Sequence, residues 1–383
     1  MFVWGNSEGG ERWKNFLTAD DERGSYNEIQ AGIAQTQYEC LPMPPKTVWE
    51  WVEAYGAIHT DPARTRGNWA DAREEAAQRL NDKITEADLE QVLLSTKDMS
   101  KRPAEEMLFG ADGWGALEQE RRRISGEDVM CPYLDFGSLT SEQQPWLSLL
   151  EKGPVGEHAH LQPLVSYMCQ EEWTALLARA VKAEDKSNWF ACLQLGLHTF
   201  IQKDYERAEK MLQQSLKAER SPWALYALAI LYRDSGMHEQ ETASMLEAWK
   251  LIPDDVSMTK ATLRCLHENR CYEQLKEVYE NLSEALQQVP RCRVYYAFAL
   301  VHTGDAAGAE AILYDNGGLL IPDIRECETI TLDLWYLIER TKAAAAGKEF
   351  DEEKSKPPRF VDFRMFANSD WLHGDQQDER SGA

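Results

Sequence analysis

Residues 195–212 read LGLHTFIQKDYERAEKML, and this stretch holds the pattern that decides the fold. An apolar segment runs to a turn at Lys203, and a second segment with alternating apolar and charged residues follows it. The turn position recurs at Gly236, Arg270 and Gly304, at intervals of 33 (236 − 203), 34 (270 − 236) and 34 (304 − 270) residues. One helix–turn–helix unit of this length cannot bury its own apolar face, so successive units must stack. The spacing therefore predicts a helical solenoid.

Small residues recur where the two helices of a unit must approach, and larger apolar residues fill the space between units. The recurring positions are Gly196, Ala208 and Leu212, then Leu228, Ala229, Tyr232, Met245 and Ala248, then Leu263, Tyr279 and Leu282, then Ala297, Ala309 and Leu313. Glu241 and Leu275 stand where two of the units should have a small residue. The pattern resembles the tetratricopeptide repeat, and it predicts a solenoid over residues 161–342. The expected fold class is mainly α, a tetratricopeptide-type solenoid preceded by a short β segment.

The chain outside the repeats divides by composition. Residues 1–60 are rich in aromatic and β-branched residues, and Tyr26–Leu41 and Thr47–Ala54 predict two strands joined by a proline-stiffened turn. Residues 61–160 predict a helical connector, and residues 343–383 predict a charged tail that is partly disordered. Two helices of the connector are expected to begin after N-caps at Asn68 and Thr85. Three more helices are expected over Pro103–Leu108, Trp114–Ile124 and Pro145–Leu150.

Charge and cysteine usage exclude several classes of function. The chain of 383 residues has a formal net charge of −24, which disfavours nucleic acid and anionic membrane surfaces as partners. Its eight cysteines form no CxxC pair and no zinc-ligand spacing with histidine, so no metal and no cofactor is expected. No secretory signal or membrane-spanning run is recognisable, and the expected location is the cytoplasm. The basic cluster at 121–123 is expected to serve the dipole of the helix that it ends.

The first sixty residues carry a more specific resemblance. The segments that carry it are FVWGN (2–6), YNEIQAG (26–32), TQYE (36–39), LP (41–42) and WEWVEAYG (49–56). They resemble the end of the domain in a bacterial family of uncharacterised proteins, domain-of-unknown-function family 5107. The resemblance implies a β-supersandwich similar to galactose mutarotase, followed by tetratricopeptide repeats, with this chain as the C-terminal part of such a protein.

The same resemblance implies a carbohydrate site. Glu28 and Gln30 match the Glu-x-Gln setting of the general base in mutarotase-type sugar epimerases, which makes Glu28 the catalytic candidate. Trp49 and Trp51 are candidates for stacking on sugar C–H surfaces. The alternative for both tryptophans is packing against the connector helices. No histidine precedes His59 to serve as the opposing acid, so no independent catalysis is expected from this chain.

Two functions follow from these observations. The first is a non-catalytic scaffold that binds a protein or peptide on the first helix of each unit, and the alternative is a carbohydrate-active or carbohydrate-binding protein. A variant of the first function is that the repeats only brace a β domain of their own protein in cis. The residues expected to line the partner-binding face are Gln194, His198, Arg233, His267, Tyr296 and His302.

Overall fold

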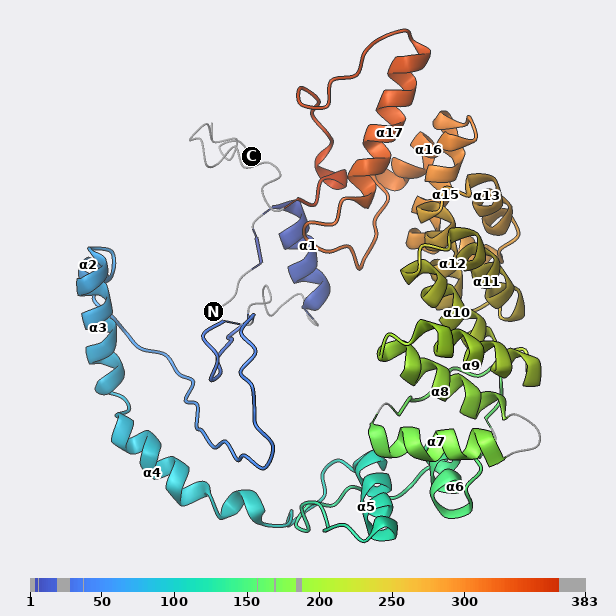
Figure 1. The fold of residues 1–383 in the computed structure, drawn as a ribbon. Coiled ribbons are helices and arrows are strands. Elements are labelled where there is room, and N and C mark those ends of the chain that lie inside the picture. Colours follow the sequence, from blue (N-terminus) through green and yellow to red (C-terminus); the bar gives the residue numbers. More distant parts are fainter. Residues whose placement is uncertain are drawn as a thin grey trace. The chain divides into compact units, whose positions relative to one another are not determined.

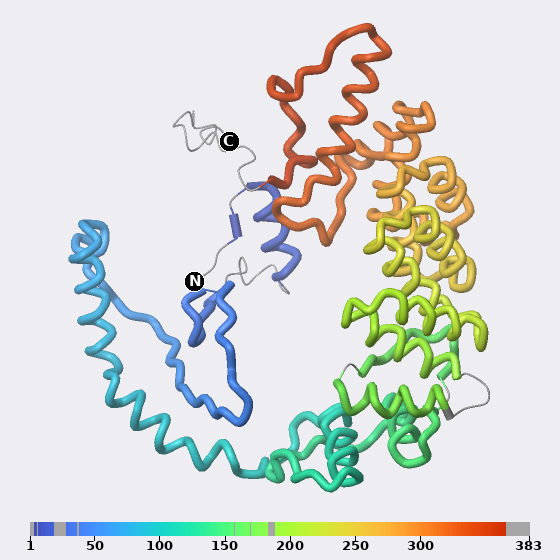
Figure 2. The backbone as a smooth tube through the Cα atoms, viewed as in Figure 1, coloured from blue at the N-terminus to red at the C-terminus, as the bar shows by residue number. Residues whose placement is uncertain are grey.

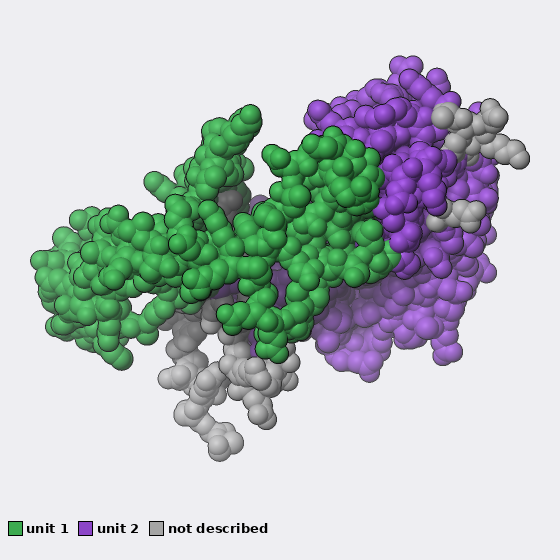
Figure 3. Space-filling model, turned by 90° about the horizontal axis from the view of Figure 1, so that it is seen from below, with its two compact units in different colours: residues 1, 29–140 green, residues 2–28, 141–383 purple. Residues whose placement is uncertain are grey.

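The structure is a computed structural model that describes residues 4–5, 7–18, 28–36, 38–156, 158–168, 170–183 and 188–364. Within these residues the chain folds into α-helices and short 3-10 turns, so the predicted mainly α class is confirmed (Figure 1; the same chain is traced in Figure 2). Two compact units are present, coloured separately in Figure 3: unit 1 consists of residue 1 and residues 29–140, and unit 2 of residues 2–28 and 141–383.

Unit 2 contains an array of helix pairs. The pairs are α8 (Trp189–Ile201) with α9 (Tyr205–Ala218), α10 (Pro222–Asp234) with α11 (His238–Leu251), α12 (Val256–Glu268) with α13 (Tyr272–Glu280), and α15 (Pro290–His302) with α16 (Ala306–Leu313). Helix α7 (Glu171–Ala183) packs on α8, and α17 (Ile330–Ala345) packs on α15 and α16. Shorter elements are α6 (Gln144–Lys152), which confirms the helix predicted there, α14 (Glu284–Gln287), η3 (Asp315–Gly317) and η4 (Arg359–Val361).

Every turn position that defines the repeat adopts the left-handed conformation. The φ angles are 62° at Lys203, 71° at Gly236, 58° at Arg270 and 97° at Gly304. In each turn the next residue donates its backbone N–H to a carbonyl five residues before it, for example Cys271 to Leu266 at 2.8 Å. This is the Schellman motif, which satisfies the last carbonyls of a helix and reverses the chain. The interval of 33 or 34 residues found in the sequence is therefore the distance along the chain between successive Schellman motifs.

The apolar core of the array is distributed along it. One buried cluster joins α8, α9 and α10, a second joins α10, α11 and α12, and a third joins α12 and α13 to α15, α16 and α17. Each cluster includes the first helix of the following pair. Neighbouring pairs thus bury each other's apolar faces, as stacked repeats must. The solenoid predicted from the spacing is confirmed.

The left-handed turns lead to a stability prediction. Replacing Lys203 with glycine should stabilise the array by about 0.5 kcal/mol, because removal of the left-handed cost outweighs glycine's larger entropy loss. Replacing Gly236 with alanine should destabilise it by about 1 kcal/mol, although a Cβ there would meet only open space. Urea denaturation followed by helical circular dichroism measures both. Effects of the same sign would contradict the assignment of these turns.

The helices of unit 1 bury little apolar surface, and Leu117 is the only buried apolar side chain among the described residues of this unit. The helices are α2 (Pro62–Thr65), α3 (Trp69–Asn81), α4 (Glu86–Thr96), η2 (Met99–Lys101) and α5 (Trp114–Ser125). The predicted N-caps are confirmed: Asn68 accepts from the N–H of Asp71, and Thr85 forms a reciprocal capping box with Asp88. The predicted helix over Pro103–Leu108 was wrong, because this stretch forms bends instead. It is too short to offset the cost of helix nucleation without a cap.

The two predicted strands were wrong within the described part of the chain. Glu28 forms an isolated bridge, and residues 29–36 and 38–60 contain no strand. Apart from a turn at Pro45 and Lys46, residues 40–60 are irregular and pair with no strand among the residues that the structure describes. Pro42, Pro44 and Pro45 lack an N–H to donate. Alternation of side chains favours a strand only where a neighbouring strand is available to pair with it.

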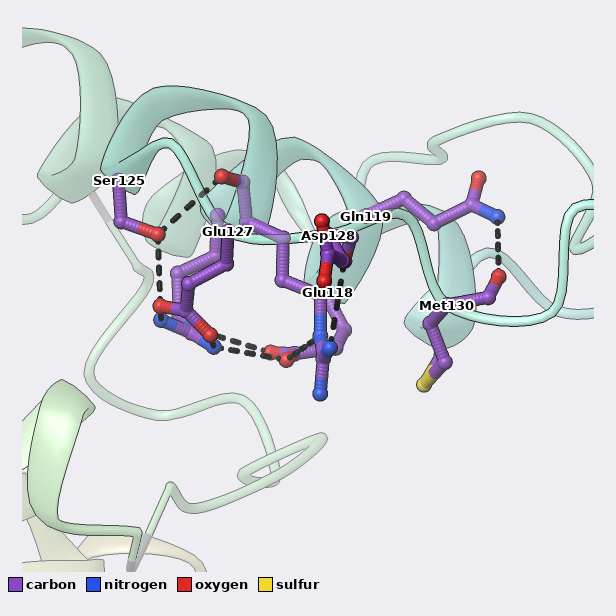
Figure 4. Close-up of polar contacts among 8 residues, drawn as sticks. Glu118, Gln119, Ser125, Glu127, Asp128 and Met130 are labelled. Carbon is purple, nitrogen blue, oxygen red and sulfur yellow. Dashed lines mark hydrogen bonds and ion pairs between the residues drawn. The ribbon is translucent and has the colours of Figure 1, made fainter.

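Polar networks, rather than apolar contacts, hold the buried charges of unit 1. Glu75 is buried and accepts hydrogen bonds from the N–H of Asp61 and from Arg64 and Arg79. Arg121 in α5 is also buried. Its guanidinium donates to the carboxylates of Glu118 and Glu127, which are labelled in Figure 4, at 2.7 to 3.0 Å.

The basic cluster at 121–123 is therefore a set of ion pairs. Arg122 also pairs with Glu118, and Arg123 pairs with Glu120. Hydrogen bonds from Arg121, the larger effect, and from Ser125 lower the pKa of Glu127 to about 2. The side chains had been expected to serve only the helix dipole.

None of the helices that the structure describes combines the length and the apolar character needed to cross a membrane.

Candidate functional site

The array has a pocket on the first helices of three successive pairs. Its volume is about 380 Å³, within the range of pockets that hold small ligands or anchoring side chains. The lining residues are Tyr226 from α10, Ser257, Lys260, Ala261 and Arg264 from α12, Arg291 and Tyr295 from α15, and Asp323 from the loop before α17. Because each helix belongs to a different pair, the stacking of the array creates the pocket.

The pocket gathers cations in a strongly acidic protein, since Lys260, Arg264 and Arg291 line it beside one carboxylate, Asp323. Arg291 is neutralised, since it bonds Asp323 at 3.1 Å and also Glu328. Arg264 has only a loose contact with Glu268, at 3.7 Å between two half-exposed side chains. Lys260 has no ion-pair partner among the residues that the structure describes. One turn of helix separates Lys260 from Arg264, so both cations lie on the same face of α12.

Aromatic rings and a small residue complete the pocket. Tyr226 and Tyr295 contribute rings with hydroxyl groups from two flanking helices, and Ala261 leaves room between them. Burial raises the pKa of Tyr295, so its hydroxyl remains neutral at physiological pH. The arrangement offers two cations for an anionic group and two rings for the apolar part of the same ligand.

Two of the residues predicted to bind a partner are buried within the array. The Nε2 atom of Gln194 donates to the carbonyl oxygen of Ser166 at 3.0 Å. The Nδ1 atom of His198 lies 3.0 Å from the Oγ1 atom of Thr174 in α7. Helix α7 and the loop before it therefore occupy the face of α8 that had been expected to be open, and these two side chains position that segment.

The other four predicted residues also lie outside the pocket. Arg233 is partly exposed and contacts Asp234 at 3.5 Å. His302 stacks on Tyr272 at 3.8 Å between ring centroids, and Tyr296 stacks on Tyr279 at 4.0 Å. His267 lies against the rings of Tyr272, Tyr295 and Phe298.

The two histidines in this group do not add to the positive charge of the pocket. Burial lowers the pKa of both His267 and His302, and for His302 the neighbouring Arg270 lowers it further. Both imidazoles are therefore neutral at pH 7. They join α12, α13 and α15 through ring contacts.

The residues proposed for a carbohydrate site fall in different units. Glu28 belongs to unit 2, whereas Gln30, Trp49 and Trp51 belong to unit 1. Trp51 is 53% exposed and donates through Nε1 to Glu53 at 3.0 Å. Trp49 is partly buried and Gln30 is exposed. The proposed roles of these four side chains stay predictions.

A positional signal in the sequence does identify part of the pocket. Tyr226 and Lys260 both lie ten residues before the left-handed residue of their unit (236 − 226 and 270 − 260). Arg264 follows Lys260 by one helical turn. Arg233, His267 and His302 lie in the last two positions of their helices, whereas Tyr226, Lys260 and Arg264 lie closer to the middle.

The structure shows no group of three or more metal-ligating side chains within the described ranges.

No protein-family model matches the chain, and none of the curated proteins matches it. Among solved structures, pilF of Pseudomonas aeruginosa is similar, with 16% sequence identity and a TM-score of 0.30. That match covers 37% of this chain and 64% of the pilF chain, so less than two thirds of pilF is spanned. The resemblance to domain-of-unknown-function family 5107 remains a prediction, and the repeat assignment rests on the turns and helix pairs described above.

Proposed function

We propose that the helical array is a scaffold that binds a polypeptide along the first helices of its pairs, with an acidic segment in the pocket between α10, α12 and α15. The observation that carries this proposal is the pair of cations on α12, Lys260 and Arg264, in a pocket framed by two tyrosines. A net charge of −24 makes two neighbouring cations on one helix face, neither held by a close ion pair within the described part of the chain, unusual for this protein.

The chemistry of the pocket is suited to carboxylates. The planar guanidinium of Arg264 can donate two parallel hydrogen bonds to one carboxylate, and Lys260 provides a second positive charge about one helical turn away. Tyr226 and Tyr295 can pack against the methylene groups of a glutamate and donate their hydroxyls. An extended peptide with two acidic residues would engage both cations at once.

Electrostatic attraction should make this binding sensitive to salt. The cations are partly exposed, and at 0.1 M ionic strength charges are screened over about 10 Å. Charge pairs at the edge of an interface mainly accelerate association and select among partners. We therefore expect specificity for acidic sequences at moderate affinity. The same pocket chemistry applies whether the acidic segment comes from another protein or from a β domain of the same protein.

A defined peptide tests the proposal. A fluorescein-labelled octapeptide of alternating glutamate and alanine is titrated with the full chain, and fluorescence anisotropy reports binding. The glutamate peptide should bind, and raising the salt concentration should weaken it progressively. Peptides with glutamine or lysine in place of every glutamate serve as matched controls and should bind at least about tenfold more weakly.

Two outcomes would contradict the proposed function. If the glutamine peptide binds as tightly as the glutamate peptide, the two cations do not select the ligand. If none of the three peptides binds at low salt, the pocket is not a peptide site.

A further inference from the structure

The first helix of the chain contacts the last part of the array, more than 300 residues away in sequence. Helix α1 (Glu8–Leu17) and the residues before it belong to unit 2. The N–H of Gly5 donates to the Oε2 atom of Glu326 at 3.3 Å, and the hydroxyl of Ser7 donates to its Oε1 atom at 3.1 Å. Glu326 is almost fully buried, so this carboxylate holds the start of α1 from within the array.

Two cation–ring contacts fix the other face of α1. The guanidinium of Arg12 lies 5.5 Å from the ring centroid of Phe363, and that of Arg325 lies 5.2 Å from the ring centroid of Trp13. Each contact joins a cation on one segment to a ring on the other, so the two pairings are reciprocal. Such contacts contribute on the order of 0.5–2 kcal/mol each, depending on their exposure. Trp13 is 8% exposed, which shows that the packing covers it.

A glycine allows the helix to approach this closely. A Cβ at Gly9 would lie 2.6 Å from the carbonyl oxygen of Phe363, a backbone atom that cannot move aside. Gly9 and Gly10 each disfavour a helix by about 1 kcal/mol relative to alanine, and a helix of ten residues is marginal by itself in water. Helix α1 therefore depends on its contacts with the array. Gly9 permits the close approach to Phe363, and Gly5 and Gly10 leave room beside Glu326.

The surface that receives α1 is built by the array. The N–H of Cys327 donates to the carbonyl of Phe363 at 2.7 Å, and the hydroxyl of Thr331 in α17 donates to the carbonyl of Val361 at 3.0 Å. Val361 and Phe363 are buried in the same apolar cluster as α15, α16 and α17. The segment at 359–364 is thus anchored on α17 independently of α1.

We propose that the α17 end of the array carries a binding site for a short helix with a glycine at its contact face, and that residues 4–18 of the same chain fill this site as a terminal cap. Stacked repeats need a cap at each end, because the last unit has no neighbour to cover its exposed face.

A cleavage experiment on the full chain tests the cap. A specific protease site is inserted between Gln35 and Thr36, where the chain is exposed, and the cleaved protein is passed over a gel-filtration column at micromolar concentration. Fragment 1–35 should elute with the array although no covalent bond holds it. Glycine-to-leucine substitutions in the fragment provide a matched pair. Leucine at Gly9 should release the fragment, whereas leucine at Gly32, where a Cβ would meet nothing within 4 Å, should not.

A substitution in the array tests the same contact without changing the sequence of the fragment. Glu326→Ala removes the two carboxylate oxygens that accept hydrogen bonds from Gly5 and Ser7. Because both are bonds to a charged group, their loss should weaken binding of the fragment to the array at least about tenfold. Helical circular dichroism of the cleaved array confirms that it stays folded. Release of the fragment from the unsubstituted protein would overturn the proposal. Retention by both the Gly9→Leu and the Glu326→Ala proteins would also overturn it, because the fragment would then be held elsewhere.

Discussion

Replacing Leu263 with alanine is expected to destabilise the middle of the array by about 3 kcal/mol. Leu263 lies on α12, is fully buried, and belongs to the cluster that α12 and α13 share with the following pair, α15 and α16, and with α17. Removing its methyl groups loses apolar burial on both sides of one interface and leaves a cavity. In an array whose stability depends on nearest neighbours, that loss acts on the two pairs that share the interface.

Native-state hydrogen exchange measures this effect where it arises. Amides of α12 and α13 should exchange about a hundredfold faster, because each 1.4 kcal/mol corresponds to a factor of ten. The matched control is Ile201→Ala, since Ile201 lies at the end of α8 and is 52% exposed. Its effect should stay within about 0.5 kcal/mol. Similar effects of the two substitutions would contradict the distributed core.

The repeat was predictable because its signal is local. A left-handed residue must follow each first helix, and the interval between such residues is set by the lengths of two helices and two turns. Gly236 and Gly304 are glycines, the residue type that adopts the left-handed conformation most readily, whereas Lys203 and Arg270 could be recognised only from their spacing. The N-caps at Asn68 and Thr85 were predictable for the same reason, since a cap involves residues only three positions apart.

The strands and the partner face depend on distant parts of the chain. Alternation at residues 47–54 indicates which side chains share a face but does not supply a neighbouring strand. Gln194 and His198 lie on a first helix as expected, yet α7 and residue 166 cover them. Burial by an earlier segment cannot be read from the pattern of α8 alone.

The cap and a buried carboxylate show the same limitation at longer range. No sequence pattern connects Gly9 with Phe363. Glu241 occupies a position where the repeat calls for a small residue, and it is buried. Asn269 at the end of α12 donates to it at 2.9 Å, so the exception is accommodated by a residue of the next helix pair. The sequence identified the exception but not the partner that satisfies it.

Reversing the two cations of the pocket should abolish binding of the acidic peptide. Lys260→Glu combined with Arg264→Glu replaces two attractions with two repulsions. At about 4 Å each interaction is worth between roughly 1 kcal/mol in water and 4 kcal/mol near a protein surface. We therefore expect affinity to fall at least about a hundredfold. The side chains are partly exposed, so the fold should tolerate the change, and circular dichroism checks this.

The control variant carries the same change in net charge on the second helices of the array. Lys250→Glu in α11 with Lys276→Glu in α13 removes two positive charges at positions outside the pocket. Any effect of net charge alone appears in this variant and should be screened at 0.1 M salt.

The most direct measurement of the proposed function is the anisotropy titration of the glutamate peptide into the unsubstituted chain and both double variants, in one buffer at 0.1 M salt. The pocket accounts for binding if the unsubstituted chain and the Lys250 and Lys276 variant bind within about threefold of each other while the Lys260 and Arg264 variant loses at least about a hundredfold. Equal affinities in the two double variants would contradict it.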